Sequence, residues 1–172
     1  MNSSYRNVII GSAAVVLLFV GLLWVSAPKK SAGNSSPQVA SAQAISGSLS
    51  AEETSFDFGT VSMKNGKVNH VFKIKNDTDS TAVVSKLFTS CMCTTASISV
   101  NGTKKGPFGM PGHGFVPSIK GEIRASGSAD VEVVFDPAAH GPAGVGRIDR
   151  VVYLEEKSGN KLELQFTAMV TP

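Results

Sequence analysis

The stretch VNHVFKIKN, residues 68–76, alternates apolar and polar side chains and predicts a β-strand with one buried face. The side chains expected on the buried face are Val68, His70, Phe72 and Ile74, and those expected opposite them are Asn69, Lys73 and Lys75. A turn-forming run follows at 76–79, and TAVVSKLFTS at 81–90 predicts the next strand. Short strands separated by polar turns indicate a protein built from β-sheet.

The same rhythm continues on both sides of this stretch. Further strands are predicted by SFDFG at 55–59, ADVEVVFDP at 129–137, GRIDRVVYLEE at 146–156 and KLELQFTAMV at 161–170. No amphipathic helical stretch of useful length follows residue 54, and Ser158-Gly159-Asn160 predicts a hairpin turn. We therefore expect an all-β domain, an immunoglobulin-like antiparallel β-sandwich of about seven strands over residues 51–172.

Two glycine-rich stretches interrupt the strand pattern. The segment NGTKKGPFGMPGHGFVPS at 101–118 contains five Gly and three Pro, which predicts a long loop without regular structure. A second stretch, HGPAGVG from His140, joins two predicted strands. Long loops on a rigid sandwich either carry function or cover a sheet edge, and the sequence leaves both alternatives open.

The N-terminal part predicts a membrane anchor and a tether. Residues 8–27, VIIGSAAVVLLFVGLLWVSA, carry no charge and are long enough to cross a bilayer as one transmembrane helix after a tail of residues 1–7. A cleaved signal peptide is the competing interpretation, but Pro28 follows the candidate cleavage site. Residues 28–50 are rich in Ser, Ala and Gly and predict a flexible linker. We expect a single-pass membrane protein whose globular domain is extracytoplasmic.

The charge distribution excludes nucleic acid as a leading partner. The formal net charge is +3, but from residue 51 onward thirteen Lys and Arg balance thirteen Asp and Glu. The folded part therefore has no excess of positive charge with which to bind a phosphate backbone.

Five segments resemble one known family. They are FDFGT at 56–60, HVFKIKN at 70–76, SCMCTTA at 90–96, ADVEVVFDP at 129–137 and the closing FTAMV. Over about residues 54–170 the chain resembles the bacterial domain of unknown function 1573, in the Hydin-like group of immunoglobulin-fold domains. Its most specific element is the Ser-Cys-x-Cys-Thr block, although Met92 stands where the family typically has Gly and the insert at roughly 101–124 is unusually long. The resemblance implies a β-sandwich, often exported and membrane-tethered, without an established activity.

The only two cysteines, Cys91 and Cys93, are two positions apart, and in an extended strand they would point to the same side. Three roles remain open. They are two small buried thiols, a reducible disulfide that fits same-strand geometry poorly, or two thiolates of a soft-metal site.

Further ligands for such a metal lie in the glycine-rich stretches. Together with Cys91 and Cys93, His113 is the first candidate metal ligand, and Met110 and His140 are additional candidates. Thiolate, thioether and imidazole ligands favour Cu(I) or, with fewer thioethers, Zn.

Motifs of known enzymes are absent from the sequence: there is no nucleophile elbow, phosphate loop, dinucleotide fingerprint or zinc-protease helix. We therefore expect no catalytic residues and no cofactor, and a membrane-anchored module for interaction with an envelope protein or for envelope structure. The alternative is a copper- or zinc-binding or thiol-redox domain that uses the Cys-x-Cys pair.

Overall fold

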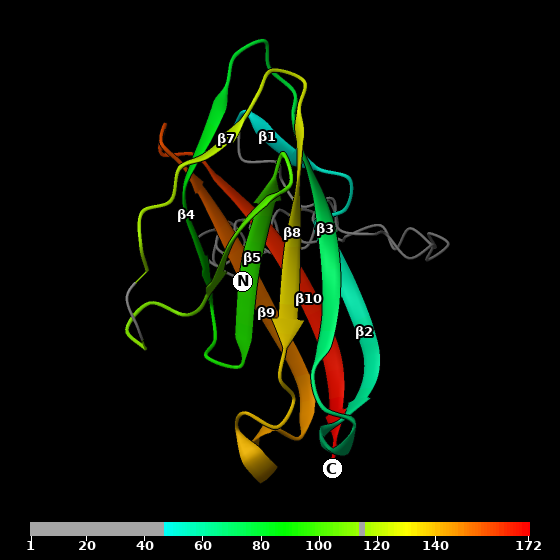
Figure 1. Ribbon diagram of the computed structural model, residues 1–172. Helices are drawn as coiled ribbons and strands as arrows, with labels where there is room; N and C mark the ends of the chain where they lie inside the picture. The colour runs from blue at the N-terminus through cyan, green and yellow to red at the C-terminus, as the bar shows by residue number, and fades with distance from the viewer. Residues whose placement is uncertain (1–46, 114–115) are drawn as a thin grey trace, which may run out of the picture. The chain divides into compact units, whose positions relative to one another are not determined.

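The computed structural model describes residues 47–113 and 116–172, which form two β-sheets of five strands each (Figure 1). Sheet A has the strand order β1-β3-β8-β5-β6, and sheet B has the order β2-β10-β9-β4-β7. The strands are β1 (Leu49–Ala51), β2 (Ser55–Ser62), β3 (Val68–Asn76), β4 (Ala82–Thr89), β5 (Thr94–Val100), β6 (Thr103–Phe108), β7 (Gly121–Ile123), β8 (Ser128–Phe135), β9 (Gly146–Glu156) and β10 (Lys161–Thr171). Two short 3-10 helices, η1 (Met63–Asn65) and η2 (Gly141–Gly144), complete the described part. The expectation of an all-β protein with two sheets is confirmed.

The core lies between the two sheets and is filled by the inward side of each alternating strand. Phe72 and Ile74 of β3 are fully buried, as the alternation in 68–76 predicts. Phe135 of sheet A packs against Phe166 of sheet B, with ring centroids 5.5 Å apart. Burial of each such side chain contributes about 1.5–3 kcal/mol, so this contact layer holds the sheets together.

The strand pairing is antiparallel with one exception among the described strands. The β9–β10 hairpin pairs Leu154 with Leu162, and β3 pairs with β8 in the same antiparallel sense. The exception is β2, which runs parallel to β10. The expectation of a purely antiparallel sandwich is therefore wrong at this edge.

The glycine-rich segment 101–118 is only partly a loop, which corrects the prediction of an irregular stretch. Thr103–Phe108 forms β6, which pairs with β5 and has no partner on its other side in sheet A. Pro is tolerated on an edge strand because no backbone donor is needed toward solvent, so Pro107 does not prevent pairing. Short or edge strands such as β1, β6 and β7 raise the number of described strands to ten, above the expected seven or so.

Strand β1 begins at Leu49, inside the segment 28–50 that the sequence predicts as a linker. Leu49 is buried and pairs with Asn76 of β3. The tail at 1–7, the transmembrane helix at 8–27 and the linker up to residue 46 lie outside the described residues. Within 47–113 and 116–172, the structure contains no helix of the length and apolarity that crossing a bilayer requires.

Three of the connections that cross between the sheets lie at the same end of the sandwich, the lower end in Figure 1. They are η1 between β2 and β3, residues 90–93 between β4 and β5, and residues 136–145 between β8 and β9. The backbone N–H of Asp136 donates to the carbonyl of Cys93 at 2.9 Å, which ties two of them together. The topology thus brings the Cys-x-Cys block next to the glycine-rich stretch that begins at His140.

Candidate functional site

The Cys-x-Cys block forms a tight turn between the sheets, not the extended strand that the sequence analysis assumed. The backbone N–H of Thr94 donates to the carbonyl of Cys91 at 3.2 Å and closes the turn. The hydroxyl of Thr89, which is almost completely buried, donates to the carbonyls of Cys91 and Thr94, each at 3.0 Å. These bonds fix the backbone of the turn, so the positions of both sulfurs are set by the fold.

Cys91 and Cys93 form a disulfide, with Cα atoms 5.3 Å apart, within the usual range for a disulfide. The loop that it closes contains three residues, since the two cysteines differ by two positions. In the chain-entropy account, a three-residue loop contributes about 1.6 kcal/mol to stability, against about 3 kcal/mol for a fifteen-residue loop. The disulfide therefore contributes little to stability.

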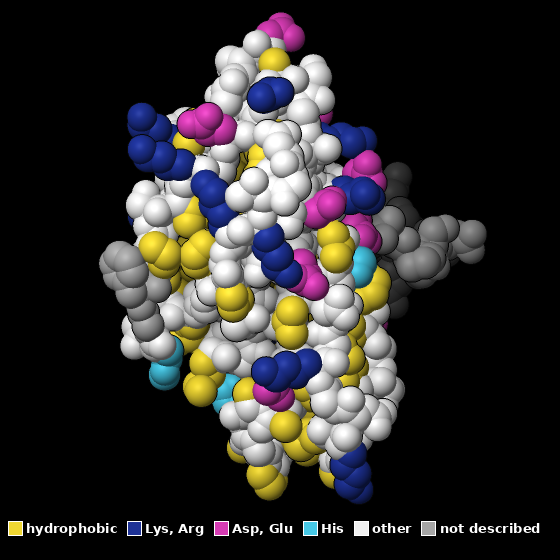
Figure 2. Space-filling view, viewed as in Figure 1, with side chains coloured by type: hydrophobic (Ala, Val, Ile, Leu, Met, Phe, Trp, Pro, Cys, Tyr) yellow, Lys and Arg dark blue, Asp and Glu magenta, His cyan; other side chains and the backbone are white. Residues whose placement is uncertain are grey.

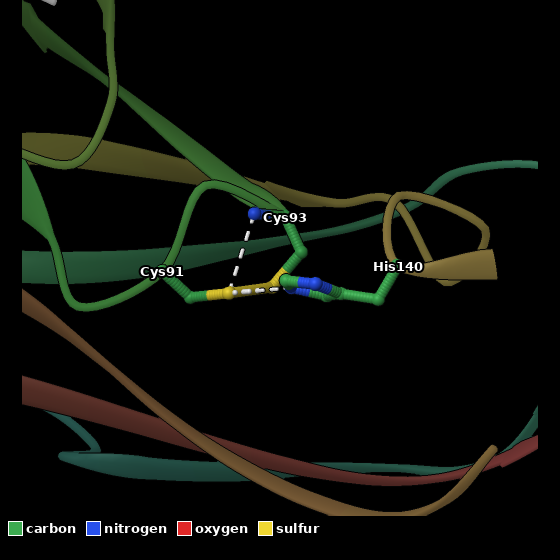
Figure 3. A group of neighbouring side chains, drawn as sticks. All are labelled: Cys91, Cys93 and His140. Atoms are coloured by element: carbon green, nitrogen blue, oxygen red, sulfur yellow. Dashed lines mark hydrogen bonds between the residues drawn. A yellow bond between two sulfur atoms is a disulfide. The ribbon is translucent and has the colours of Figure 1, made fainter. Parts of the chain in front are cut away.

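His140 reaches the disulfide from the β8–β9 connection (Figure 3). Its Nε2 lies 3.2 Å from Cys91 Sγ, and the backbone N–H of Cys93 lies 3.3 Å from the same sulfur. The two sulfurs and a ring nitrogen of His140 lie within 4.8 Å of one another. The imidazole is exposed, whereas Cys91 and Cys93 are 9% and 3% exposed. Cys91 Sγ thus lies beside an exposed imidazole, which is a group able to accept or donate a proton.

Arg150 approaches the other sulfur from β9. Its Nε donates to Cys93 Sγ at 3.4 Å, while Nη1 donates to the carbonyl of Asp149 at 2.8 Å, which anchors the guanidinium. A cation in this position stabilises negative charge on sulfur, because thiolates form most readily beside Arg, Lys or His⁺. The disulfide therefore lies between an imidazole at Cys91 and a guanidinium at Cys93.

A shallow pocket of about 430 Å³ lies beside this group. It is lined in part by His140, Val145, Arg147 and Arg150. Val145 and Met92 are exposed apolar side chains of the two connections that form this end of the sandwich. Figure 2 shows hydrophobic and histidine side chains gathered toward the lower end of the face in view. Val145 and Met92 thus lie on the same two connections as His140 and the two cysteines.

Of the five candidate ligands, the structure brings Cys91, Cys93 and His140 together. His113 is exposed and lies outside that group. Met110 is half-buried, one residue after Gly109, whose carbonyl accepts from the backbone N–H of Thr89 at 3.2 Å. The backbone of that loop therefore comes near the turn without His113 joining the cluster.

Arg150 is not among the site residues that the sequence predicts. The signal is present in GRIDRVVYLEE, where Ile148, Val152 and Leu154 lie on the buried side of β9. Arg150 occupies the same side by the period of two and is half-buried. An arginine on an inward position requires a partner, and Cys93 Sγ is that partner.

Residues 49–109 match the family model described as a protein of unknown function, DUF1573. The match spans β1 to β6 and contains the Cys-x-Cys turn, which supports the family expected from the sequence. No curated protein matches the chain.

The chain is also similar to solved structures. A protein of unknown function from Porphyromonas gingivalis W83 aligns with a TM-score of 0.53 and 14% identity over 77% of this chain, which spans about half (51%) of that protein. The secreted serine protease VesC from Vibrio cholerae aligns with a TM-score of 0.46 and 14% identity, covering 72% of this chain and 24% of that one. PapD-like domain 7 of human CEP192 aligns with a TM-score of 0.41 and 13% identity, covering 84% and 98%. The similarity to the Porphyromonas gingivalis protein shows a common sandwich fold and says nothing about activity.

Proposed function

We propose that this chain is a β-sandwich module whose Cys91–Cys93 pair exchanges its disulfide with the thiols of a partner protein. The observation that carries the proposal is the placement of the bond between His140 Nε2, 3.2 Å from Cys91 Sγ, and Arg150 Nε, 3.4 Å from Cys93 Sγ. A purely structural disulfide needs neither group. This role also fits the expected interaction module, because exchange requires that a partner docks.

The two sulfurs have different roles. The residue Cys91 is 9% exposed and Cys93 is 3% exposed, so the thiolate of the partner attacks Cys91 Sγ and forms a mixed disulfide with it. The Cys91–Cys93 bond breaks, and its electron pair stays on Cys93 Sγ as a thiolate beside the Arg150 guanidinium. His140 Nε2 is in position to accept the proton of the incoming thiol.

A second thiol of the partner completes the exchange. It attacks the partner sulfur of the mixed disulfide, and Cys91 leaves as a thiolate beside His140. The partner dithiol is thereby oxidised to a disulfide, and the Cys91–Cys93 pair is reduced by the same two electrons. The pocket of about 430 Å³ that is lined in part by His140 and Arg150 offers the partner chain a place to bind.

The redox equilibrium of the full chain in detergent, measured as free thiols in glutathione buffers, tests this function. We expect both thiols to appear together, with a midpoint less negative than about −300 mV, the range of labile disulfides. Arg150→Leu should favour the disulfide about tenfold, a shift of about 30 mV to more negative potential, because a charged hydrogen bond to the thiolate is lost. Arg147→Leu removes a nearby charge that has no sulfur contact and should leave the midpoint unchanged. A midpoint below about −300 mV, or thiols that appear only on unfolding, would refute the proposal.

We also propose that the module lies outside the cytoplasm. Residues 8–27 supply an uncharged span for anchoring, and residues 28–50 a tether, so the module is displayed outside the cytoplasm where disulfides persist. Alkaline phosphatase needs its own disulfides, so a fusion of it after Pro172 should be active in bacterial cells. Removal of residues 1–27 should abolish that activity. An inactive fusion that accumulates at normal levels would place the domain in the cytoplasm.

A further inference from the structure

Cys91, Cys93 and His140 together offer three atoms that can ligate a metal ion once the disulfide is reduced. The three ligand atoms already lie within 4.8 Å of one another. Ligand atoms around one metal ion are about 3.5–4 Å apart, given metal–sulfur bonds of about 2.3 Å. Once the disulfide is reduced, a small separation of the two sulfurs meets this requirement while His140 stays in place.

We infer that the reduced chain binds one Cu(I) ion through Cys91, Cys93 and His140. Two thiolates and an imidazole are soft donors, which select Cu(I). Structural zinc sites have four ligands, and within the described residues the group contains no fourth His, Cys, Asp or Glu. The donor count thus excludes a closed structural zinc site, and a three-ligand zinc site would have to keep its fourth position for water.

The charge of the surroundings points the same way. Two thiolates and Cu(I) carry one net negative charge, and the Arg150 guanidinium beside Cys93 Sγ balances it. A divalent ion would leave the thiolate pair neutral and would be repelled more strongly by the same guanidinium. The site is therefore matched to a monovalent cation.

Copper binding and the disulfide exclude each other, because only the thiolate is a metal ligand. The inference rests on the proposed function in one respect. Exchange with a partner dithiol supplies the two electrons that reduce the Cys91–Cys93 disulfide. Oxidation of the pair would release the ion. The redox state of Cys91 and Cys93 thus controls whether this end of the sandwich holds a metal.

The test is a competition for Cu(I) against bicinchoninate under anaerobic conditions, with the full chain in detergent. The reduced chain should withdraw one equivalent of copper, and the oxidised chain none. The double variant Cys91→Ser, Cys93→Ser should withdraw none, while its thermal unfolding shows that it is folded. His140→Ala should weaken binding by about tenfold or more. His113→Ala, an exposed histidine outside the group, is the matched control and should bind as the parent chain does.

Several results would overturn the inference. They are failure of the reduced chain to withdraw copper, equal withdrawal by the oxidised chain, and equal losses for the two histidine variants. Tighter binding of Zn(II) than of Cu(I) would also overturn the choice of metal. Because copper is titrated onto chemically reduced protein, loss of binding with normal glutathione exchange removes this inference alone. Normal binding with no disulfide exchange removes the proposed function alone.

Discussion

Replacement of Cys93 with Ser should convert the full chain into a trap for mixed disulfides. The remaining cysteine, Cys91, is the more exposed residue of the two, and its Sγ lies 3.2 Å from His140 Nε2. With glutathione disulfide it should form a stable adduct, because no second thiol in the chain can release it. Intact-mass spectrometry measures the fraction of chain that carries glutathione as a function of time.

The reciprocal variant is the control for this trap. Cys91→Ser leaves Cys93, which is 3% exposed, and we expect its adduct to form roughly tenfold more slowly, since exchange depends on access to the sulfur. Both variants lose the same disulfide, so a difference in rate reports position and not stability. Equal rates, or faster reaction of Cys93, would contradict the assignment of Cys91 as the attacked sulfur.

The strands that alternate strictly could be predicted from sequence. The predicted segments 68–76 and 146–156 coincide with β3 and β9, because side chains that alternate between core and solvent leave a period of two. Strand β6 could not be predicted in this way. Thr103–Phe108 contains Gly106 and Pro107 and has no buried side chain, so only its pairing with β5 defines it.

The two cysteines of the candidate site could be predicted from the sequence, but the choice of histidine could not. The sequence favours His113 as the first further ligand, and it offers His140 only as an additional candidate. The topology separates them: β4–β5 and β8–β9 both cross between the sheets at one end, and this brings His140 to Cys91 across 49 positions. Residue spacing carries no information about which connections share an end. The tight turn likewise depends on the buried hydroxyl of Thr89, which a strand pattern does not reveal.

Truncation of Phe135 to Ala should lower the free energy of unfolding by about 3–5 kcal/mol, which is a large part of the stability of a single domain. Phe135 is 2% exposed, and its ring lies 5.5 Å from that of Phe166 and 6.4 Å from that of Phe58, both in the opposite sheet. Loss of the ring leaves a cavity between the sheets. Urea unfolding of the full chain in detergent, monitored by far-UV circular dichroism, measures the change in the free energy of unfolding.

Phe88→Ala is the matched control, since it removes the same ring from a half-buried position. Phe88 stacks on Tyr153 of the neighbouring strand at 5.0 Å, and its removal should cost about 1 kcal/mol. A loss for Phe135→Ala no greater than for Phe88→Ala would contradict the described core.

Phe135 also connects the core to the site. It pairs with Thr94, the residue after Cys93, and it precedes Asp136, whose backbone N–H donates to the Cys93 carbonyl. A cavity at Phe135 should therefore loosen the contact between His140 and Cys91 as well as the sheets. Phe135→Leu fills most of the cavity and should restore both stability and the rate at which the Cys93→Ser chain forms its glutathione adduct. Recovery of stability without recovery of that rate would mean that the ring itself, and not the packing of the sheets, positions the connection that carries His140.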